Sequence, residues 1–112
     1  MSVPRLNRKL VREEAVRVAD GAGGHRLDWV ARGEVWAEIT AGSGVERAGE
    51  FVTLASVPLV ILVRAAPVGA ASRPKPEQRF REGARIFRIL AVAERDRGGH
   101  YLSCFAREEV VA

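Results

Sequence analysis

Apolar and polar residues alternate along much of this chain, and the alternation predicts β-strands. The clearest case lies between Asp28 and Thr40, where Val35, Ala37 and Ile39 alternate with Trp36, Glu38 and Thr40. A period of two places successive side chains on opposite faces, as a half-buried strand requires. Comparable runs predict four further strands, at Leu10–Val18, from Phe51 or Ser56 to Arg64, at Arg85–Ala93 and at Tyr101–Arg107.

Glycine-containing and polar segments separate these predicted strands. Asp20–Gly24 and Asp96–Gly99 have the composition of tight turns. Residues 41–50 form a polar, glycine-containing loop with room for one helical turn, and residues 65–78 form a basic Pro/Ala-rich loop. Prolines at alternate positions predict an extended, polyproline-like arm in the second loop.

About five to six strands in a chain of this length predict an all-β fold. A small antiparallel β-barrel with long loops is favoured, because closing the sheet removes exposed strand edges. The 112 residues predict a single domain, 1–112, with residues 1–9 as an N-terminal extension. In the last strand Leu102, Cys104 and Ala106 share one face, so Cys104 is predicted to be a buried, inert thiol.

Composition excludes several classes of protein. The longest apolar run is residues 57–63, much shorter than the roughly 20 residues of a membrane-spanning helix, so no membrane association is expected. A single cysteine excludes an internal disulfide framework and favours a reducing cytoplasm. The net charge of +4 is concentrated in residues 1–12 and 73–88, which suggests contact with an acidic surface or with nucleic acid, or simply a preference for arginine.

The chain lacks a recognisable catalytic or metal-binding motif. His25 and His100 lie in predicted turns, far from Cys104, and match no zinc-ligand spacing. The adjacent pairs Glu13–Glu14 and Glu108–Glu109 point to opposite faces of their strands and are interpreted as solvated charge. We therefore expect no enzyme activity, no catalytic residue, no metal and no cofactor.

Two tryptophans leave a different function open. Trp29 and Trp36 could stack on nucleobases, as aromatic residues do in barrels that bind single strands. A small β-barrel nucleic-acid-binding protein is therefore the alternative hypothesis. Tryptophan in a half-buried strand more often packs in a core or an interface, and we favour that interpretation.

An ordered set of features covers residues 6–107. It comprises a Leu/Arg-containing strand, a glycine-rich turn, Trp29 ahead of the pentapeptide Val35–Ile39, a polar loop, a strand ending in Arg64, and the run Arg85–Leu90 before the closing strand. In this order and spacing the chain resembles the phage head–tail joining family, the head-closure or stopper proteins of phages and of phage-like gene transfer agents. It departs from the family pattern at Val57–Pro58, where members often have Thr-His, and in its longer, more basic loop at 65–78.

The resemblance implies a virion structural protein in the neck, assembled in the bacterial cytoplasm. Its protomers would form a cyclic hexamer or dodecamer that joins the portal or adaptor to the tail and surrounds a channel for double-stranded DNA. By position, the candidate channel loop contains Gly42, Gly44, Glu46, Arg47 and Glu50, unless this segment is an ordinary solvated connection.

The candidate interface combines apolar and basic residues. The strand at 57–63 is apolar on both faces, whereas a small core needs to cover only one face. The other face is therefore free for a neighbouring subunit, and the basic arm at 73–81 could reach an acidic neighbour or DNA. The candidate interface residues are Val57, Leu59, Val60, Arg73, Lys75, Arg79 and Arg81.

Overall fold

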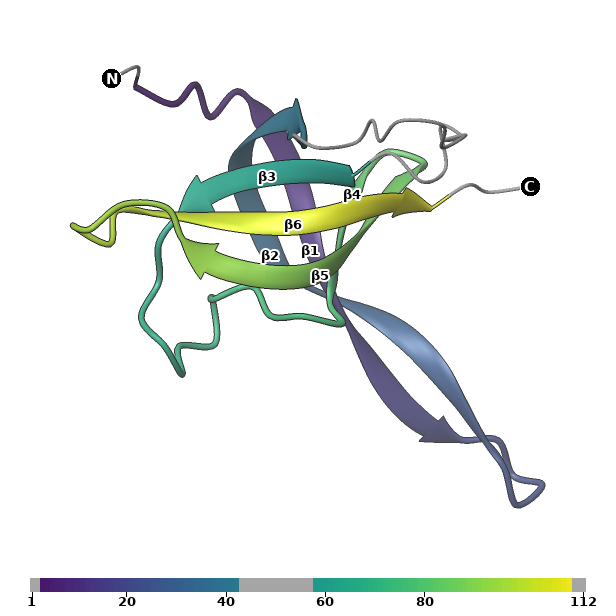
Figure 1. Ribbon diagram of the computed structural model, residues 1–112. Coiled ribbons are helices and arrows are strands. Elements are labelled where there is room, and N and C mark those ends of the chain that lie inside the picture. The colour runs from purple at the N-terminus through teal and green to yellow at the C-terminus, as the bar shows by residue number, and fades with distance from the viewer. Residues whose placement is uncertain (1–2, 43–57, 110–112) are drawn as a thin grey trace, which may run out of the picture.

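A computed structural model describes residues 3–42 and 58–109 of the chain, and six β-strands make up its fold (Figure 1). The strands are β1 (Arg8–Ala19), β2 (His25–Ala41), β3 (Pro58–Arg64), β4 (Arg79–Glu82), β5 (Arg85–Glu94) and β6 (Tyr101–Glu109). Within these two ranges the structure contains no helix. The predicted all-β class is confirmed.

The strands form one closed sheet in the order β1-β2-β3-β6-β5-β4. Every neighbouring pair is antiparallel. The ring closes through a short register in which Val11, Arg12 and Glu13 of β1 face Arg81, Phe80 and Arg79 of β4. Closure gives Val11–Glu13 of β1 a second neighbour in β4 and Ala37–Ala41 of β2 a second neighbour in β3, so these parts of the first hairpin have no free edge.

The core fills the inside of this ring. Alternate residues of every strand point inward, and ten of them form one cluster in which none is more than 1% exposed. These residues are Leu10, Ala37, Ile61, Val63, Phe80, Phe87, Ile89, Leu102, Cys104 and Ala106. Val35, Ala37 and Ile39 all contribute to or pack against this cluster, as the period of two in their strand predicted.

The Cys104 thiol is completely buried in this core, as its strand alternation predicted. Burial raises its pKa to about 12, so almost no thiolate exists near neutral pH. We expect the native protein to react with a thiol reagent at pH 8 at least about a thousandfold more slowly than the guanidinium-unfolded chain. Absorbance of the released aromatic thiolate measures both rates, and similar rates would contradict this placement of Cys104.

Two features of the fold differ from the sequence-based expectation. The residues after Pro76 do not extend into solvent, because Arg79–Glu82 forms β4 and closes the barrel. The loop at 65–78 also folds back: Pro74 and Gln78 are buried, and the Arg73 guanidinium donates to the carbonyl of Ala66 at 3.0 Å. The expected extended basic arm at 73–81 is therefore wrong.

The first hairpin extends far beyond the barrel. β1 and β2 remain paired out to Ala19 and His25, whereas β4 pairs with β1 only as far as Glu13. A bulge marks the exit from the barrel, since the partner of Arg12 is Gly33 and the partner of Glu13 is Ala31. Residues 14–31, which we call the hairpin arm, project from the barrel as a two-stranded ribbon (Figure 1).

A tight turn closes the tip of the hairpin arm. The Asp20 Oδ1 atom accepts hydrogen bonds from the backbone amides of Ala22 at 2.8 Å and Gly24 at 3.0 Å. Gly21 and Gly23 have φ angles of 82° and 85°, which glycine adopts without strain. The predicted turn at residues 20–24 is confirmed, but the second strand begins at His25, three residues earlier than predicted.

Candidate functional site

The candidate channel loop lies almost wholly outside the described residues. Gly44, Glu46, Arg47, Glu50 and the interface residue Val57 belong to the undescribed segment 43–57, and their roles stay predictions. Gly42 follows β2 directly, and its amide donates to the carbonyl of Pro58 at 2.8 Å. The two ends of the segment therefore meet at one hydrogen bond between β2 and β3.

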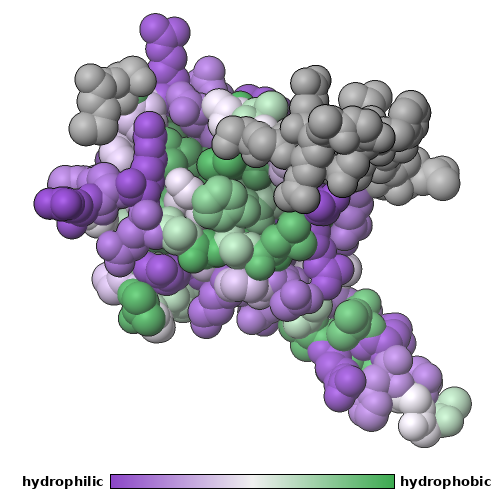
Figure 2. All heavy atoms as spheres, in the orientation of Figure 1, coloured by the Kyte–Doolittle hydropathy of each residue, from purple (hydrophilic) through white to green (hydrophobic). Residues whose placement is uncertain are grey.

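A group of apolar side chains lies on the outside of the barrel over β3, β6 and β5. Val60 is the partner of Phe105, and Phe105 is the partner of Ala91, so all three share the outward face. Leu62 lies on the same face but is only 4% exposed, and Leu90 lies at a bulge in β5. Phe105 is 43% exposed and Leu90 48%. These five residues form the outer patch, and Figure 2 shows apolar side chains gathered over these strands.

The structure divides the predicted interface residues of β3 between two faces. Val60 belongs to the outer patch, whereas Leu59 packs against the core from inside. Lys75 is exposed in the loop, and Arg73 is half-buried beside Ala66. β3 is therefore apolar on both faces because one face packs in the core and the other forms part of the outer patch.

Arg79 and Arg81, the remaining predicted interface residues, bind one buried carboxylate. Arg79 Nε lies 2.7 Å from Glu13 Oε1, and Arg81 Nε lies 2.9 Å from Glu13 Oε2. Glu13 is only 5% exposed, so its interpretation as solvated charge is wrong. Burial acts to raise the pKa of Glu13, but hydrogen bonds and charge from both arginines outweigh it and keep this pKa below its usual value.

Arg79 also contacts the base of the hairpin arm, together with Arg88 of β5. The Arg79 guanidinium carbon lies 4.1 Å from the centroid of the Trp29 ring, and that of Arg88 lies 5.9 Å away. Both distances fit a cation–π interaction. Trp29 thus packs against arginines of β4 and β5 and lies outside the core cluster, so its placement in a core or an interface stays a prediction. Trp36 is 55% exposed on the outside of β2.

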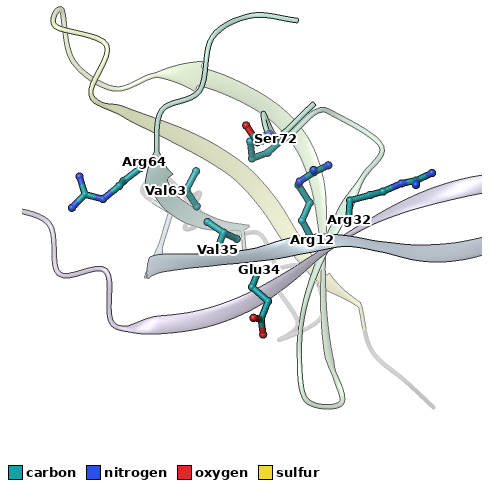
Figure 3. A pocket seen from close by; sticks show the side chains of 9 residues that line it. Arg12, Arg32, Glu34, Val35, Val63, Arg64 and Ser72 are labelled. Carbon is teal, nitrogen blue, oxygen red and sulfur yellow. The ribbon is translucent and has the colours of Figure 1, made fainter. Parts of the chain in front are cut away.

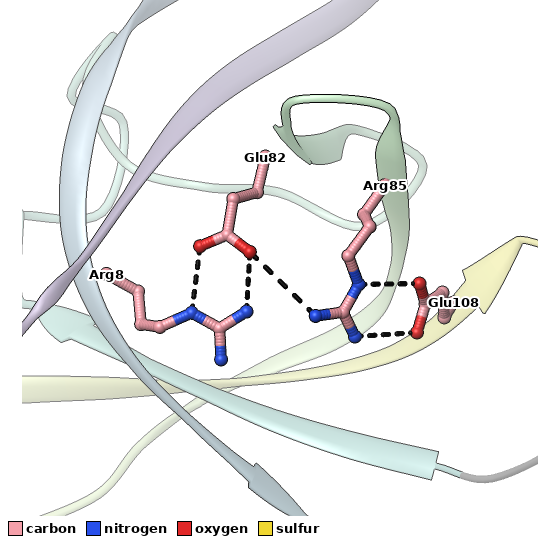
Figure 4. Close-up of polar contacts among 4 residues, drawn as sticks. All are labelled: Arg8, Glu82, Arg85 and Glu108. Atoms are coloured by element: carbon pink, nitrogen blue, oxygen red, sulfur yellow. Dashed lines mark hydrogen bonds and ion pairs between the residues drawn. The ribbon is translucent and has the colours of Figure 1, made fainter.

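A second network of charges connects β1, β4, β5 and β6 (Figure 4). Arg8 Nε donates to Glu82 at 2.8 Å, and Arg85 donates to both oxygens of Glu108 at 2.8 and 2.9 Å. Arg85 also lies 3.9 Å from Glu82. Hydrogen bonds from Arg8 and Arg85 lower the pKa of Glu82 and of Glu108, respectively. The basic segment at 73–88 is therefore largely neutralised within the chain.

These networks predict a loss of stability in acid. The pKa values of Glu13, Glu82 and Glu108 are lower in the folded protein than in the unfolded chain. Each carboxylate therefore stabilises the fold above its unfolded pKa of about 4.3, and the stabilisation is lost as the pH falls further. We expect the urea midpoint to decrease between about pH 5 and pH 3. The Glu13→Gln variant should show a weaker decrease, and an equal decrease would contradict the role of Glu13.

A small pocket of about 110 Å³ lies between β1, β2, β3 and the loop at 65–78. Arg12, Arg32 and Arg64 line it, but Figure 3 shows Arg64 pointing away from the other two. The buried Arg12 guanidinium donates to Gln78 Oε1 at 3.0 Å and to the Ala71 carbonyl at 2.8 Å. Its hydrogen bonds therefore fasten the loop at 65–78 to the barrel, and the pocket does not gather cations around a common point.

The residues considered for metal binding or catalysis are dispersed. His25 lies at the tip of the hairpin arm, Cys104 is in the core, and His100 Nδ1 contacts Asp96 Oδ2 at 2.7 Å in the turn between β5 and β6. Within residues 3–42 and 58–109, no group of three or more histidine, cysteine or acidic residues could hold a metal ion. In the same part of the chain no helix is long and apolar enough to cross a membrane.

The chain is similar to structural proteins of phages and of phage-like particles. The family model for phage head completion proteins matches residues 1–109. A chain from the virion of a native gene transfer agent particle is 88% identical, with a TM-score of 0.80, and the match covers 98% of this chain and 100% of that one. Protein SF1141 from Shigella flexneri 2a is 18% identical, with a TM-score of 0.70 and full coverage of both chains, and supports the fold alone.

Among curated proteins no significant match was found. The family match extends over nearly the whole chain, and it agrees with the resemblance to head-closure proteins that the order of sequence features indicated. The chain belongs to the phage head completion protein family, and with it to the structural proteins of a phage-like virion.

Proposed function

We propose that this protein forms a ring in the neck of a phage-like particle, where it joins the portal or adaptor to the tail and closes the DNA channel. The observation that carries the proposal is the 88% identity to a chain of a gene transfer agent virion over 98% of this sequence. At such identity the two chains have the same fold and nearly the same surface, so a position in the same kind of particle is expected.

The geometry of the barrel supports assembly through protein contacts. The outer patch and the hairpin arm expose apolar side chains at two separate places on the molecule. A repeated contact between two different surfaces produces a closed ring when the rotation between neighbours is suitable. Exposed apolar patches of this kind are typical of protein interaction sites.

Removal of the gene in a producing strain tests the proposed function. We expect heads that package DNA but then release it, or that fail to acquire tails, because the ring that closes and extends the neck is missing. Electron microscopy and the amount of nuclease-protected DNA measure both outcomes, and expression of the wild-type chain in trans provides the control. Normal numbers of tailed, DNA-filled particles in the deletion strain would overturn the proposal.

A further inference from the structure

The hairpin arm has one face that combines an exposed leucine with a cation. Arg17 and Leu27 are cross-strand partners and therefore lie side by side on this face, which Ala15, Ala19 and their partners Trp29 and His25 share. Leu27 is 60% exposed. Arg17 is also exposed, and it forms no ion pair with any residue in the described part of the chain. This face therefore combines an exposed leucine with an arginine that has no ion-pair partner among the described residues.

The outer patch has a carboxylate at its β2 side that could pair with a cation of the arm. Glu38 is the cross-strand partner of Leu62, so its carboxylate lies beside the apolar residues of the patch. The Glu38 Oε2 atom accepts a hydrogen bond from the backbone amide of Arg5 at 2.8 Å. Among the described residues Glu38 has no arginine or lysine side chain as an ion-pair partner. The patch is therefore apolar, with the Glu38 carboxylate at its β2 side and the exposed arginines Arg64 and Arg107 at the ends of β3 and β6.

We propose that the hairpin arm of one protomer packs on the outer patch of a second copy of this chain. Leu27 then contacts Phe105 and its neighbours, and Arg17 approaches Glu38. The inference rests on the proposed function, because it identifies the contact between neighbouring subunits of the ring. It requires two different surfaces, so each protomer gives its arm to one neighbour and receives an arm from the other.

The dimensions of the hairpin arm fit this contact. Residues 14–19 extend about 20 Å at the usual rise of about 3.3 Å per residue. The three strands under the outer patch span about 10 Å at the usual strand spacing. The arm is therefore long enough to cross the patch on an adjacent barrel. Its base is held by Trp29, Arg79 and Glu13, which gives the arm a defined direction before assembly.

Cross-linking within assembled particles tests the contact. A strain lacking the native gene expresses the Leu27→Cys and Phe105→Cys variants together, and a short bismaleimide is added to the purified particles. The native Cys104 is buried and provides no competing thiol. We expect a covalent dimer of this chain in the mixed particles. Particles that contain either variant alone should yield no dimer.

The other outcomes separate the two proposals. If both variants are present in the particles at wild-type amounts and no dimer forms, the proposed arm contact is wrong, whereas the proposed ring in the neck is unaffected. A dimer in particles that contain only Leu27→Cys would show that two hairpin arms contact each other. A cross-link from Leu27→Cys to a different virion protein would show that the arm binds that protein. Either outcome would overturn the inference. Absence of the wild-type chain from purified particles would instead overturn the proposed function.

A charge exchange tests the same contact without cysteines. We expect Arg17→Glu to reduce the yield of tailed particles at least about tenfold, because it places two carboxylates together. The double variant Arg17→Glu with Glu38→Arg should restore the yield. Arg26→Glu is the matched control, since Arg26 lies on the opposite face of the arm and should leave the yield nearly unchanged. Failure of the double variant to recover, with both single variants folded, would contradict the contact.

Discussion

Replacing Phe87 by alanine is expected to lower the free energy of unfolding by about 3–5 kcal/mol. Phe87 is completely buried and is the cross-strand partner of Phe80, which is also completely buried. Truncation removes apolar burial and leaves a cavity that the closed ring of strands cannot easily fill. Because small domains are stable by only about 5–15 kcal/mol, this loss would leave a substantial unfolded population at moderate temperature.

The matched control is Phe105→Ala, the same substitution on the outside of β6. Phe105 is 43% exposed, so we expect a loss of only about 1 kcal/mol. Urea unfolding followed by circular dichroism measures both changes. Equal losses for the two variants would mean that Phe87 and Phe105 do not lie on opposite sides of the sheet.

Replacing Glu13 by alanine is expected to lower the free energy of unfolding by about 3 kcal/mol. The substitution leaves the Arg79 side chain, which is only 15% exposed, without its carboxylate partner. Arg81 is 39% exposed and can regain contact with water. The loss of unfolding free energy should therefore lie near the lower end of the range of about 3–5 kcal/mol that is typical when one partner of a buried ion pair is removed. The same variant should loosen the base of the hairpin arm, because Arg79 also packs on Trp29.

Glu14→Ala is the control for Glu13→Ala. Its carboxylate lies 3.0 Å from Arg32, but both side chains are more than 40% exposed. Exposed pairs contribute little, so we expect a loss below about 1 kcal/mol. Hydrogen exchange of the backbone amides at residues 14–19 and 25–30 would show whether the arm itself loosens. Equal destabilisation by the two neighbouring substitutions would contradict the assigned role of Glu13.

Local patterns predicted the parts of the fold that depend on local order. The alternation at Val35–Ile39 identified which residues enter the core, because a strand imposes a period of two whatever its neighbours are. The same reasoning placed Cys104 inside. The turn at residues 96–99 was also predicted, since its polar and glycine residues suit a tight connection between β5 and β6.

Features that depend on distant pairing were missed. β4 has only four residues and one apolar side chain, Phe80, so its sequence carries almost no periodic signal. The burial of Glu13 depends on β4, which supplies both arginines across more than 60 residues of sequence. The hairpin arm was missed because pairing of β1 with β2 continues past the barrel without a core to impose a pattern. Only a map of strand pairs would have revealed these features.

The continuity between the hairpin arm and the barrel has a mechanical consequence. β1 and β2 run without interruption from the arm into the ring of strands, where β4 flanks one and β3 flanks the other. A pulling force at the arm tip would act along both strands and load the flanking hydrogen bonds in shear. These bonds run across the strand direction, so they would have to break together instead of opening one by one. A force applied at the arm tip would therefore be shared by the strands that flank β1 and β2 in the barrel.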